Sequence, residues 1–349
     1  MKRILLVGGG HAHLVVLRAL AKEPLQGARL ALVTPRARQL YSGMLPGVIA
    51  GHYRREEAEI DVAQLAARAQ AEFIHGEVAA FDAQQRSVTL KDGGELEFDC
   101  ASLNAGSLAD TAVPGSTAHA LPVKPFEALV ERLESAQAGH FAVIGGGAAG
   151  VELAMALRHR GAQASVYSER APFSASLTRR VARALRAQSV NSLAMAVARL
   201  ESGPTVVTAT TQARYDAVVL ASGARALPWL AGSGLATDER GFALVDDTLQ
   251  SVSHPEVFAA GDCATLRSHP VPKSGAYAVR QGETLGQNLK RLAQGEPLVP
   301  YRPQRQALML LTCGRRYAIA QRGGWSAEGR WVWWWKDRID RGWIKSLAA

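Results

Sequence analysis

Residues 141–154 read FAVIGGGAAGVELA, an apolar run that ends in a glycine-rich turn and continues into a sequence typical of a helix start. Glycines at Gly145, Gly147 and Gly150 let the backbone turn sharply and approach a pyrophosphate. The amide groups and the positive end of the helix dipole then hold its charge. This order of strand, turn and helix predicts a dinucleotide-binding unit.

A second glycine-rich turn lies near the amino terminus, where residues 4–13 read ILLVGGGHAH. Gly8 and Gly10 match the fingerprint, and His11 belongs to the same turn. His13 stands where a third glycine normally permits close packing of helix on strand. We predict that the two histidines pack within the loop rather than bind a metal, because side chains two positions apart at a helix start point in different directions.

A third signature follows much later, where residues 257–262 read VFAAGD. An apolar strand that ends in Gly261 and Asp262 can place one carboxylate near a bound cofactor. Such a pair alone is typical of an ordinary strand end with a turn aspartate. After two nucleotide loops, the order favours a cofactor site.

Short Val/Ile/Leu-rich runs alternate with alanine-rich stretches, which predicts an α/β protein with mostly parallel sheets. Residues 1–106 and 141–223 repeat one plan, from a glycine loop to an apolar strand that ends in a small-residue turn. Because Gly261 and Asp262 should complete the first unit, the second is expected to be inserted into it, with hinges near residues 113–125 and 238–242. We predict two Rossmann-like domains and a short C-terminal segment: 1–115 and 241–300 for the first domain, 116–240 for the second, and 301–349 for the segment.

The composition is that of a soluble globular protein, with 48% apolar and 20% charged residues in 349. The formal net charge of +9 favours anionic partners, and given the two loops we expect nucleotides and no nucleic acid. Only four apolar residues separate Arg3 from Gly8, too few for a signal-peptide core. No apolar run reaches the roughly 18 residues that cross a bilayer. A cytoplasmic location is expected.

The three cysteines, Cys100, Cys263 and Cys313, are far apart in the sequence. Their spacing predicts no disulfide framework, no CxxC redox pair and no zinc site. Electron transfer should therefore depend on a cofactor rather than on a dithiol, and Cys263, beside Asp262, should be a small buried side chain.

These residues resemble the two-dinucleotide flavoprotein oxidoreductases of the glutathione-reductase fold. Within that group the chain is most similar to type II NADH dehydrogenases and to the flavoprotein module joined to selenophosphate synthetase. The resemblance covers essentially the whole chain and rests, besides the loops, on these segments: YSGMLPG at 41–47, LPVK at 121–124, GDCA at 261–264, QG at 281–282 and the tryptophan-rich tail.

The resemblance implies that the first loop and Asp262 hold FAD and that the second loop holds NAD(P)H. It places Tyr41, in the 41–47 loop, beside the isoalloxazine, and Lys124 on the interdomain crossover, near enough to influence the flavin, which makes Lys124 a candidate catalytic residue. Thr34 and Pro35 stand where an acidic residue should bind the adenosine ribose. The FAD assignment therefore depends mainly on Gly8, Gly10 and Asp262.

Two carboxylates of the second unit are candidate functional groups. Glu169, at a strand end, can accept the ribose hydroxyls and repel a 2′-phosphate, which favours NADH, although the adjacent Arg170 can serve that phosphate instead. Glu152, two places beyond Gly150, is the other candidate catalytic residue, expected to orient the nicotinamide or to manage a proton at the flavin. The alternative for Glu152 is a first-turn carboxylate that stabilises the helix dipole.

The sequence leaves the identity of the electron acceptor open. Residues 275–282, GAYAVRQG, resemble the quinone-side segment of type II dehydrogenases, but Ala276 stands where those enzymes carry a glutamine. We expect an FAD-dependent NADH:acceptor oxidoreductase that uses a quinone or another acceptor. Two alternatives are a flavin-binding scaffold or redox sensor without turnover and a reductase of sulfur or selenium metabolism.

The tail combines indole rings with basic side chains. This composition suits peripheral contact with anionic lipid at the inner face of the cell membrane. The alternatives are a tail packed over the flavin domain and a homodimer seam, where tryptophans fill large volumes. The tail residues in question are Trp325, Trp331, Trp333, Trp334, Trp335 and Trp343, with Arg330, Lys336, Arg338, Arg341 and Lys345.

Overall fold

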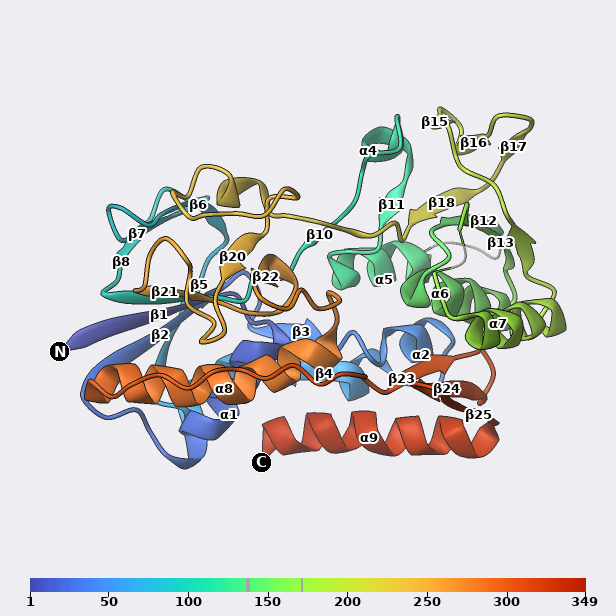
Figure 1. The fold of residues 1–349 in the computed structure, drawn as a ribbon. Helices are drawn as coiled ribbons and strands as arrows, with labels where there is room; N and C mark the ends of the chain where they lie inside the picture. The colour runs from blue at the N-terminus through green and yellow to red at the C-terminus, as the bar shows by residue number, and fades with distance from the viewer. Residues whose placement is uncertain (136–138, 171) are drawn as a thin grey trace.

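The computed structural model describes residues 1–135, 139–170 and 172–349. Two five-stranded parallel sheets lie toward opposite ends of the molecule, and helix α9 (Arg330–Ala348) begins beside the second unit and extends toward the first (Figure 1). The predicted α/β architecture with two Rossmann-like units is confirmed. Strand β21 (Val257–Ala259) pairs with the first sheet, so the second unit is inserted into the first.

The first sheet has the strand order β21-β9-β1-β2-β5, with every pair parallel. Ile4 to Val7 of the central strand are buried, as expected for a strand covered on both faces. Because β1 pairs with β2 on one side and with β9 on the other, the order reverses there and opens a crevice at the carboxyl ends. The remaining strands are β1 (Lys2–Val7), β2 (Ala28–Thr34), β5 (Ala71–His75) and β9 (Cys100–Leu103).

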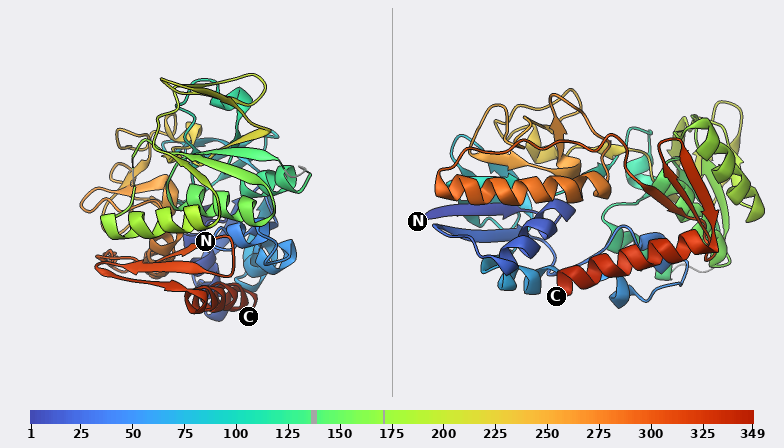
Figure 2. Two further views of the ribbon diagram at one scale, coloured as in Figure 1. Left: turned by 90° about the vertical axis from the view of Figure 1, so that its right-hand side faces the viewer. Right: turned by 60° about the horizontal axis from the view of Figure 1, so that its bottom comes forward.

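Helix α8 lies along α1 on one face of this sheet (Figure 2). The two helices approach closely because Gly282 of α8 has no side chain. A Cβ there would lie 2.6 Å from the carbonyl oxygen of Ala12. The helices of the first unit are α1 (His11–Lys22), α2 (Leu45–Ile49), α3 (Val62–Arg68) and α8 (Gly275–Gln294), with 3-10 turns η1 (Arg55–Ala58), η2 (Pro228–Leu230) and η3 (Gly261–Cys263).

Three smaller sheets complete the first unit. Two of them, β3-β4 and β6-β7-β8, are antiparallel, and β20-β22 is parallel. Their strands are β3 (Arg38–Leu40), β4 (Glu59–Asp61), β6 (Val78–Asp82), β7 (Ser87–Leu90), β8 (Glu95–Glu97), β20 (Ala243–Val245) and β22 (Ala264–Leu266).

The second sheet has the order β11-β18-β12-β13-β14 and repeats the reversal at its central strand β12. A three-stranded antiparallel sheet, β15-β16-β17, lies beyond it (Figure 1). The elements are α4 (Ser116–His119), β11 (Leu121–Pro122), α5 (Phe126–Ser135), β12 (His140–Ile144), α6 (Ala148–His159), β13 (Gln163–Tyr167), α7 (Ala175–Ala187), β14 (Asn191–Leu193), β15 (Arg199–Glu201), β16 (Thr205–Val207), β17 (Gln212–Arg214) and β18 (Ala217–Leu220).

The chain enters and leaves the inserted unit side by side. Strand β10 (Leu108–Ala109) pairs antiparallel with β19 (Ala224–Arg225). After β19 the chain rejoins the first core, where Leu230 and Leu235 are buried among residues of the first sheet, although both precede residue 240.

The tail forms an antiparallel sheet followed by α9 (Figure 2). Val332 and Trp333 of the helix are buried against the second core, and Leu347 is buried against the first. Within the described part of the chain, no helix combines the length and apolarity needed to span a membrane. The strands are β23 (Met309–Thr312), β24 (Ala318–Arg322) and β25 (Trp325–Gly329).

Candidate active site

The first glycine loop lies at the reversal point of the first sheet. Gly8 has a left-handed φ of 92°, and a Cβ there would lie 2.5 Å from Ala105 Cα of the segment that follows β9. A Cβ on Gly10 would lie 2.3 Å from Asn104 Oδ1. Both positions therefore require glycine, as the sequence predicted.

Asn104 joins this loop to the third signature. Its Oδ1 accepts the N–H groups of Ala12 at 2.9 Å and His13 at 3.2 Å, and its Nδ2 donates to Ala260 O at 2.6 Å. A Cβ on Gly261, where φ is 72°, would lie 2.5 Å from Nδ2. Asn104 was not among the predicted site residues, although a polar residue at the end of an apolar strand was the available signal.

His13 packs inside the loop, as predicted. Its Nδ1 lies 2.6 Å from Gly8 O, and its Nε2 lies 2.8 Å from Ser102 Oγ. Since a carbonyl only accepts, Nδ1 carries the proton and Nε2 accepts from the serine hydroxyl. Burial lowers the pKa of His13 to about 4, against a smaller opposing effect of the Gly8 hydrogen bond. A neutral histidine thus fixes the glycine turn in place of the missing third glycine.

Asp262, of the third signature, forms an ion pair with Lys124. Lys124 Nζ donates to Asp262 Oδ2 at 2.7 Å and to Ser107 Oγ at 2.9 Å, and that hydroxyl donates to the same Oδ2 at 3.3 Å. Gly261 N donates to Gln281 Oε1 at 2.6 Å. Residues from three distant segments therefore meet around the predicted Gly-Asp signature, and both contacts of the carboxylate engage Oδ2.

The second loop repeats the geometry of the first. A Cβ on Gly145 would lie 2.3 Å from Ala221 O of the segment after β18, and one on Gly150 would lie 1.9 Å from Gly145 O. Gly147, in contrast, has no heavy atom within 4 Å of that position and precedes α6 without a side-chain cap, among the residues described. The free backbone N–H groups at such a helix start can bind a phosphate group, and no side chain at Gly147 blocks their approach. We call this arrangement a cradle.

Glu169 lies just beyond β13 with an exposed side chain, as does Arg170. Ser168, which precedes them, lies against the glycine loop, because a Cβ on Gly146 would meet its Oγ at 2.3 Å. Glu169 is thus near the phosphate cradle along the chain, and its carboxylate is accessible.

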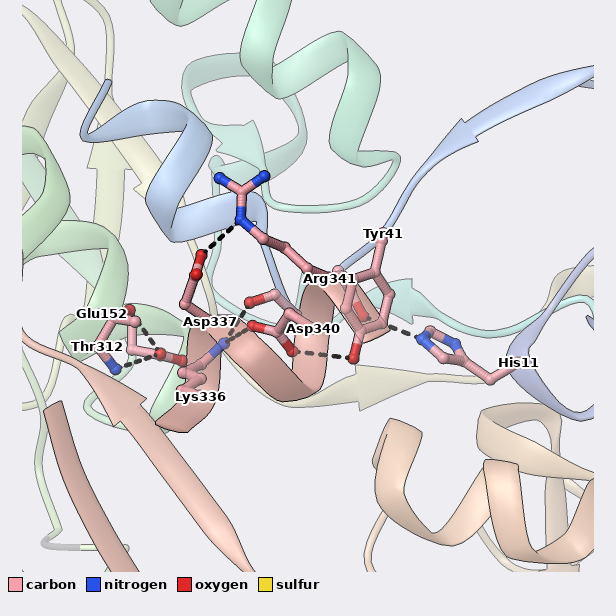
Figure 3. Close-up of polar contacts among 10 residues, drawn as sticks. His11, Tyr41, Glu152, Thr312, Lys336, Asp337, Asp340 and Arg341 are labelled. Atoms are coloured by element: carbon pink, nitrogen blue, oxygen red, sulfur yellow. Dashed lines mark hydrogen bonds and ion pairs between the residues drawn. The ribbon is translucent and has the colours of Figure 1, made fainter. Parts of the chain in front are cut away.

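Glu152 is the fifth residue of α6 and lies beyond its first turn. The alternative of a first-turn, dipole-stabilising carboxylate is therefore wrong. Its Oε1 accepts from Thr312 N at 2.7 Å and from Thr312 Oγ1 at 2.8 Å, which fastens α6 to strand β23 of the tail (Figure 3). Burial raises the pKa of Glu152, while Lys336 and the two Thr312 hydrogen bonds oppose that rise.

Lys336 occupies the centre of a buried polar network. Its Nζ donates to Gly43 O and to Asp340 Oδ2, both at 2.6 Å, and Asp340 Oδ1 accepts from Tyr41 OH at 3.3 Å (Figure 3). Burial raises the pKa of Asp340, against the effect of Lys336. The tail thereby holds the 41–47 loop. Sequence reasoning missed this pair, for which the spacing i, i+4 was the only signal.

His11 continues the network toward the first loop. Its ring lies 5.6 Å from that of Tyr41 and stacks on Trp343 at 6.4 Å between centroids, while Nε2 lies 3.5 Å from Ser42 Oγ. Burial lowers the pKa of His11, and Asp262 opposes the effect. The described structure therefore brings His11 and Tyr41 together.

The cysteines Cys100, Cys263 and Cys313 are all buried and unpaired thiols. Burial raises the pKa of Cys100 to about 12 and that of Cys263 to about 11, and it raises the pKa of Cys313 as well. Buried thiols held in the protonated form are poor nucleophiles. This agrees with the prediction that Cys263 is a packing residue.

The tail differs from the sequence expectation in its charges. Lys336 is buried in its ion pair, and Arg341 pairs with Asp337 at 2.9 Å and with Glu57 at 3.1 Å, so these two cations bind protein rather than serving a lipid surface. Arg330, Arg338 and Lys345 remain exposed.

The tryptophans divide between packing and exposure. Trp333 is buried, and Trp335 and Trp343 pack partly against the two cores. Trp331 and Trp334 are 55% and 51% exposed on α9, and Trp325 is 49% exposed on β25. The helix therefore packs on the protein with one face and presents indole rings on another.

Residues 2–282 match the family model described as pyridine nucleotide-disulphide oxidoreductase. The chain belongs to this family. The two glycine loops, each at the start of a helix, are called the first and the second cradle below. The chain is an FAD-dependent NAD(P)H oxidoreductase. The described residues fit both groups, since glycines line each cradle and Asp262 offers a carboxylate beside the first.

The chain is also similar to two curated proteins. The chain is 28% identical over 285 residues to ferroptosis suppressor protein 1 of Taeniopygia guttata, and the alignment covers 72% of each of the two chains. It is 26% identical over 372 residues to the alternative NAD(P)H-ubiquinone oxidoreductase C1 of Arabidopsis thaliana, covering 90% of this chain and 71% of that protein.

Among solved structures, the fold matches the sulfide:quinone oxidoreductase of Aquifex aeolicus with a TM-score of 0.82 at 15% identity, over 99% of this chain and 91% of that one. It also matches NDH2 from Plasmodium falciparum in complex with NADH, with a TM-score of 0.81 at 12% identity, over 98% and 97% of the two chains. These identities are low, and the matches establish the fold alone.

Proposed function

We propose that this protein is an NADH:quinone oxidoreductase that works at a membrane surface. The observation that carries the proposal is the pair of glycine cradles of matching geometry, one beside Asp262 and the other beginning the helix that carries Glu152. When bound, FAD supplies the two-electron step between the nicotinamide and the acceptor. The residues around the two cradles bind the reactants, orient them and balance their charge.

Asp262 and Lys124 have complementary roles at the first cradle. Because both protein contacts engage Oδ2, Oδ1 is the oxygen to accept a hydroxyl of the ribitol chain. Lys124 keeps the carboxylate fixed and balances its charge. Gly8 and Gly10 leave the backbone open to the pyrophosphate, with His13 bracing the turn from behind.

Glu169 supports a preference for NADH. An exposed carboxylate just after β13 accepts the two ribose hydroxyl hydrogens and repels the 2′-phosphate of NADPH. Glu152 is proposed to orient the nicotinamide. Its Oε1 is occupied by Thr312, which leaves Oε2 of the ionised carboxylate to accept an N–H of the carboxamide group.

Quinone as the acceptor is supported by three observations. The ubiquinone oxidoreductase named above is similar over most of the chain. The segment beginning at Gly275 lacks the glutamine of type II dehydrogenases at Ala276, but Gln304 Nε2 donates to Ala276 O at 3.3 Å and brings an amide to this position. Exposed Trp331 and Trp334 on α9 suit an interface where quinones dissolve. A cytoplasmic protein bound at the inner face of the membrane is therefore proposed.

Anaerobic mixing of the purified, flavin-loaded protein with NADH tests the donor half. Bleaching of the flavin absorbance within seconds supports the enzyme, and an oxidised flavin indicates a scaffold or sensor. Addition of a short-chain quinone to the reduced protein then tests the acceptor half. Reoxidation by polysulfide or a selenium compound but not by quinone indicates the sulfur or selenium alternative.

A further inference from the structure

The two histidines of the first glycine loop differ in how firmly their rings are held. The His13 ring makes two short hydrogen bonds, with Gly8 O at 2.6 Å and with Ser102 Oγ at 2.8 Å, so both of its nitrogens are engaged. Among the residues that the structure describes, the His11 ring has one hydrogen-bond partner, Ser42 Oγ, at 3.5 Å from Nε2. A hydroxyl group can donate or accept, so this long contact fixes neither tautomer. The His11 ring can therefore gain and lose a proton without breaking a strong hydrogen bond.

His11 lies where the first cradle, the tail and α8 meet. Its ring is next to that of Tyr41, with 5.6 Å between centroids, and it stacks on Trp343 of α9 (Figure 3). On the side of α8, a Cβ on Gly275 would lie 3.4 Å from His11 Nε2. Because Gly275 has no side chain, this position leaves the nitrogen uncovered. Gly275 also begins the segment that resembles the quinone side of type II dehydrogenases, so Nε2 lies against the proposed acceptor site.

The charges around His11 make its protonated form a good proton donor. Burial lowers the pKa of His11, the Asp262 carboxylate opposes this effect, and the Lys124 ammonium adds to it. Two further charged groups lie behind the aromatic rings, Arg18 against Trp343 and Asp340 against Tyr41. An imidazolium in these surroundings releases its proton more readily than one in water.

Conversion of a quinone into its hydroquinone takes two electrons and two protons. A hydride equivalent from the reduced flavin carries the electron pair and one proton, and the second proton has to come from the protein or from water. We propose that His11 supplies this second proton. The N–H bond at Nε2 of the imidazolium breaks, its electron pair stays on the nitrogen, and an O–H bond forms at the second quinone oxygen. Solvent then returns a proton to the imidazole. The inference rests on the proposed quinone acceptor and gives that half of the reaction its general acid.

Anaerobic stopped-flow reoxidation of the NADH-reduced, flavin-loaded protein by a short-chain quinone tests the proposal, from about pH 8 down to about pH 5.5. The wild-type rate constant should rise as the pH falls, because the protonated form of His11 becomes more populated. His11→Gln should lower the rate constant at the acid end by at least about tenfold, within what general acids contribute, and should remove the pH dependence. The exposed His75→Gln should keep the wild-type profile.

His11→Phe separates proton transfer from packing, because it keeps an aromatic ring against Trp343. It should match His11→Gln with quinone. Reoxidation by ferricyanide, which takes electrons without a proton, should stay at the wild-type rate in both variants. A His11→Phe variant with the wild-type rate and pH profile would overturn the proposal, as would variants slowed equally with both acceptors.

The wild type alone separates the two levels of the argument and requires no variant to fold. Reoxidation by quinone that does not change with pH contradicts only the role of His11. A reduced flavin that ferricyanide oxidises and quinone does not, at any pH, contradicts the quinone acceptor and the His11 assignment with it.

Discussion

Lys336 Nζ lies 2.6 Å from Asp340 Oδ2, and the two side chains are only 9% and 6% exposed. The same ammonium group binds Gly43 O in the loop beside Tyr41. A single cation of the tail thus holds one turn of α9 and a loop of the first unit together. Buried pairs of this kind contribute less than their contact suggests when intact, but breaking one leaves an uncompensated charge.

Lys336→Met should lower the free energy of unfolding by about 3 kcal/mol, because Asp340 loses its counterion in a buried site. Urea unfolding followed by circular dichroism measures the change. Arg338→Met, on the exposed face of the same helix, is the matched control and should stay within about 0.5 kcal/mol. Equal effects of the two variants would show that the pair has no role in stability.

Acidification should destabilise the protein through His13. Its folded-state pKa of about 4 lies below the ordinary histidine value of 6.5, so between these values the unfolded chain binds a proton that the native loop does not. Stability is therefore fully present above about pH 6.5 and is lost as the pH falls toward 4, by roughly 3 kcal/mol in total. His13→Gln should flatten that dependence in unfolding titrations at pH 7 and pH 5, and the exposed His75→Gln should not.

Glu152→Gln should slow flavin reduction by NADH by at least about tenfold, because a neutral amide orients the carboxamide less well than an ionised carboxylate. Burial raises the pKa of Glu152, so the wild-type rate should fall on the acid side above the ordinary glutamate value, and the variant should lack that limb. Stopped-flow absorbance over a pH series provides the measurement. Thr312→Val, which keeps the carboxylate and its backbone hydrogen bond, should retain the acid limb.

Wild-type protein should use NADH with about tenfold or greater efficiency relative to NADPH, since Glu169 accepts ribose hydroxyls and repels a phosphate. Glu169→Ala should narrow the ratio of kcat/KM values, mainly by improving NADPH. Arg170→Ala is the informative comparison. If Arg170→Ala rather than Glu169→Ala changes the ratio, the Arg170 cation recognises the ribose end of the nucleotide, and the prediction that Glu169 sets a preference for NADH is wrong.

Trp331 and Trp334 should mediate binding to vesicles that contain anionic lipid. Changing both to serine should reduce the bound fraction in sedimentation by at least about tenfold, because two indole rings that are exposed in the free protein would no longer be buried in the lipid interface. Trp229→Phe, in the first unit, is the control. Binding should be only partly salt-sensitive, because Lys336 and Arg341 are engaged within the protein. Loss of a dimer in sedimentation velocity, with vesicle binding unchanged, would assign the same surface to self-association.

The fold was predictable because its signals are local. An apolar strand followed by Gly8 and Gly10, or by Gly145 and Gly150, specifies a turn that no other residue can form, and the structure shows the backbone contacts that require it. The place of Asp262 just after a buried strand was predictable for the same reason, while its role at a cofactor stays a prediction. These positions are set by their immediate neighbours in the chain.

The contacts made by the tail could not be predicted in the same way. Nothing near Lys336 in the sequence indicates that it meets Gly43, and nothing near Glu152 indicates that it meets Thr312, since both contacts join segments far apart in the chain. The composition of the tail suggested a basic surface. Only the packing of α9 shows which cations are neutralised inside the protein.

The pairing of Leu108–Ala109 with Ala224–Arg225 places the two ends of the inserted unit next to each other. A segment with adjacent ends can be cut out of a gene and its flanks rejoined by a short turn, so the nucleotide-binding half is an exchangeable cassette from the standpoint of the host domain. The contacts of Glu152 with Thr312, and of Arg180 and Arg183 with Glu328, limit that freedom. A transplanted cassette from another oxidoreductase would have to bring its own tail.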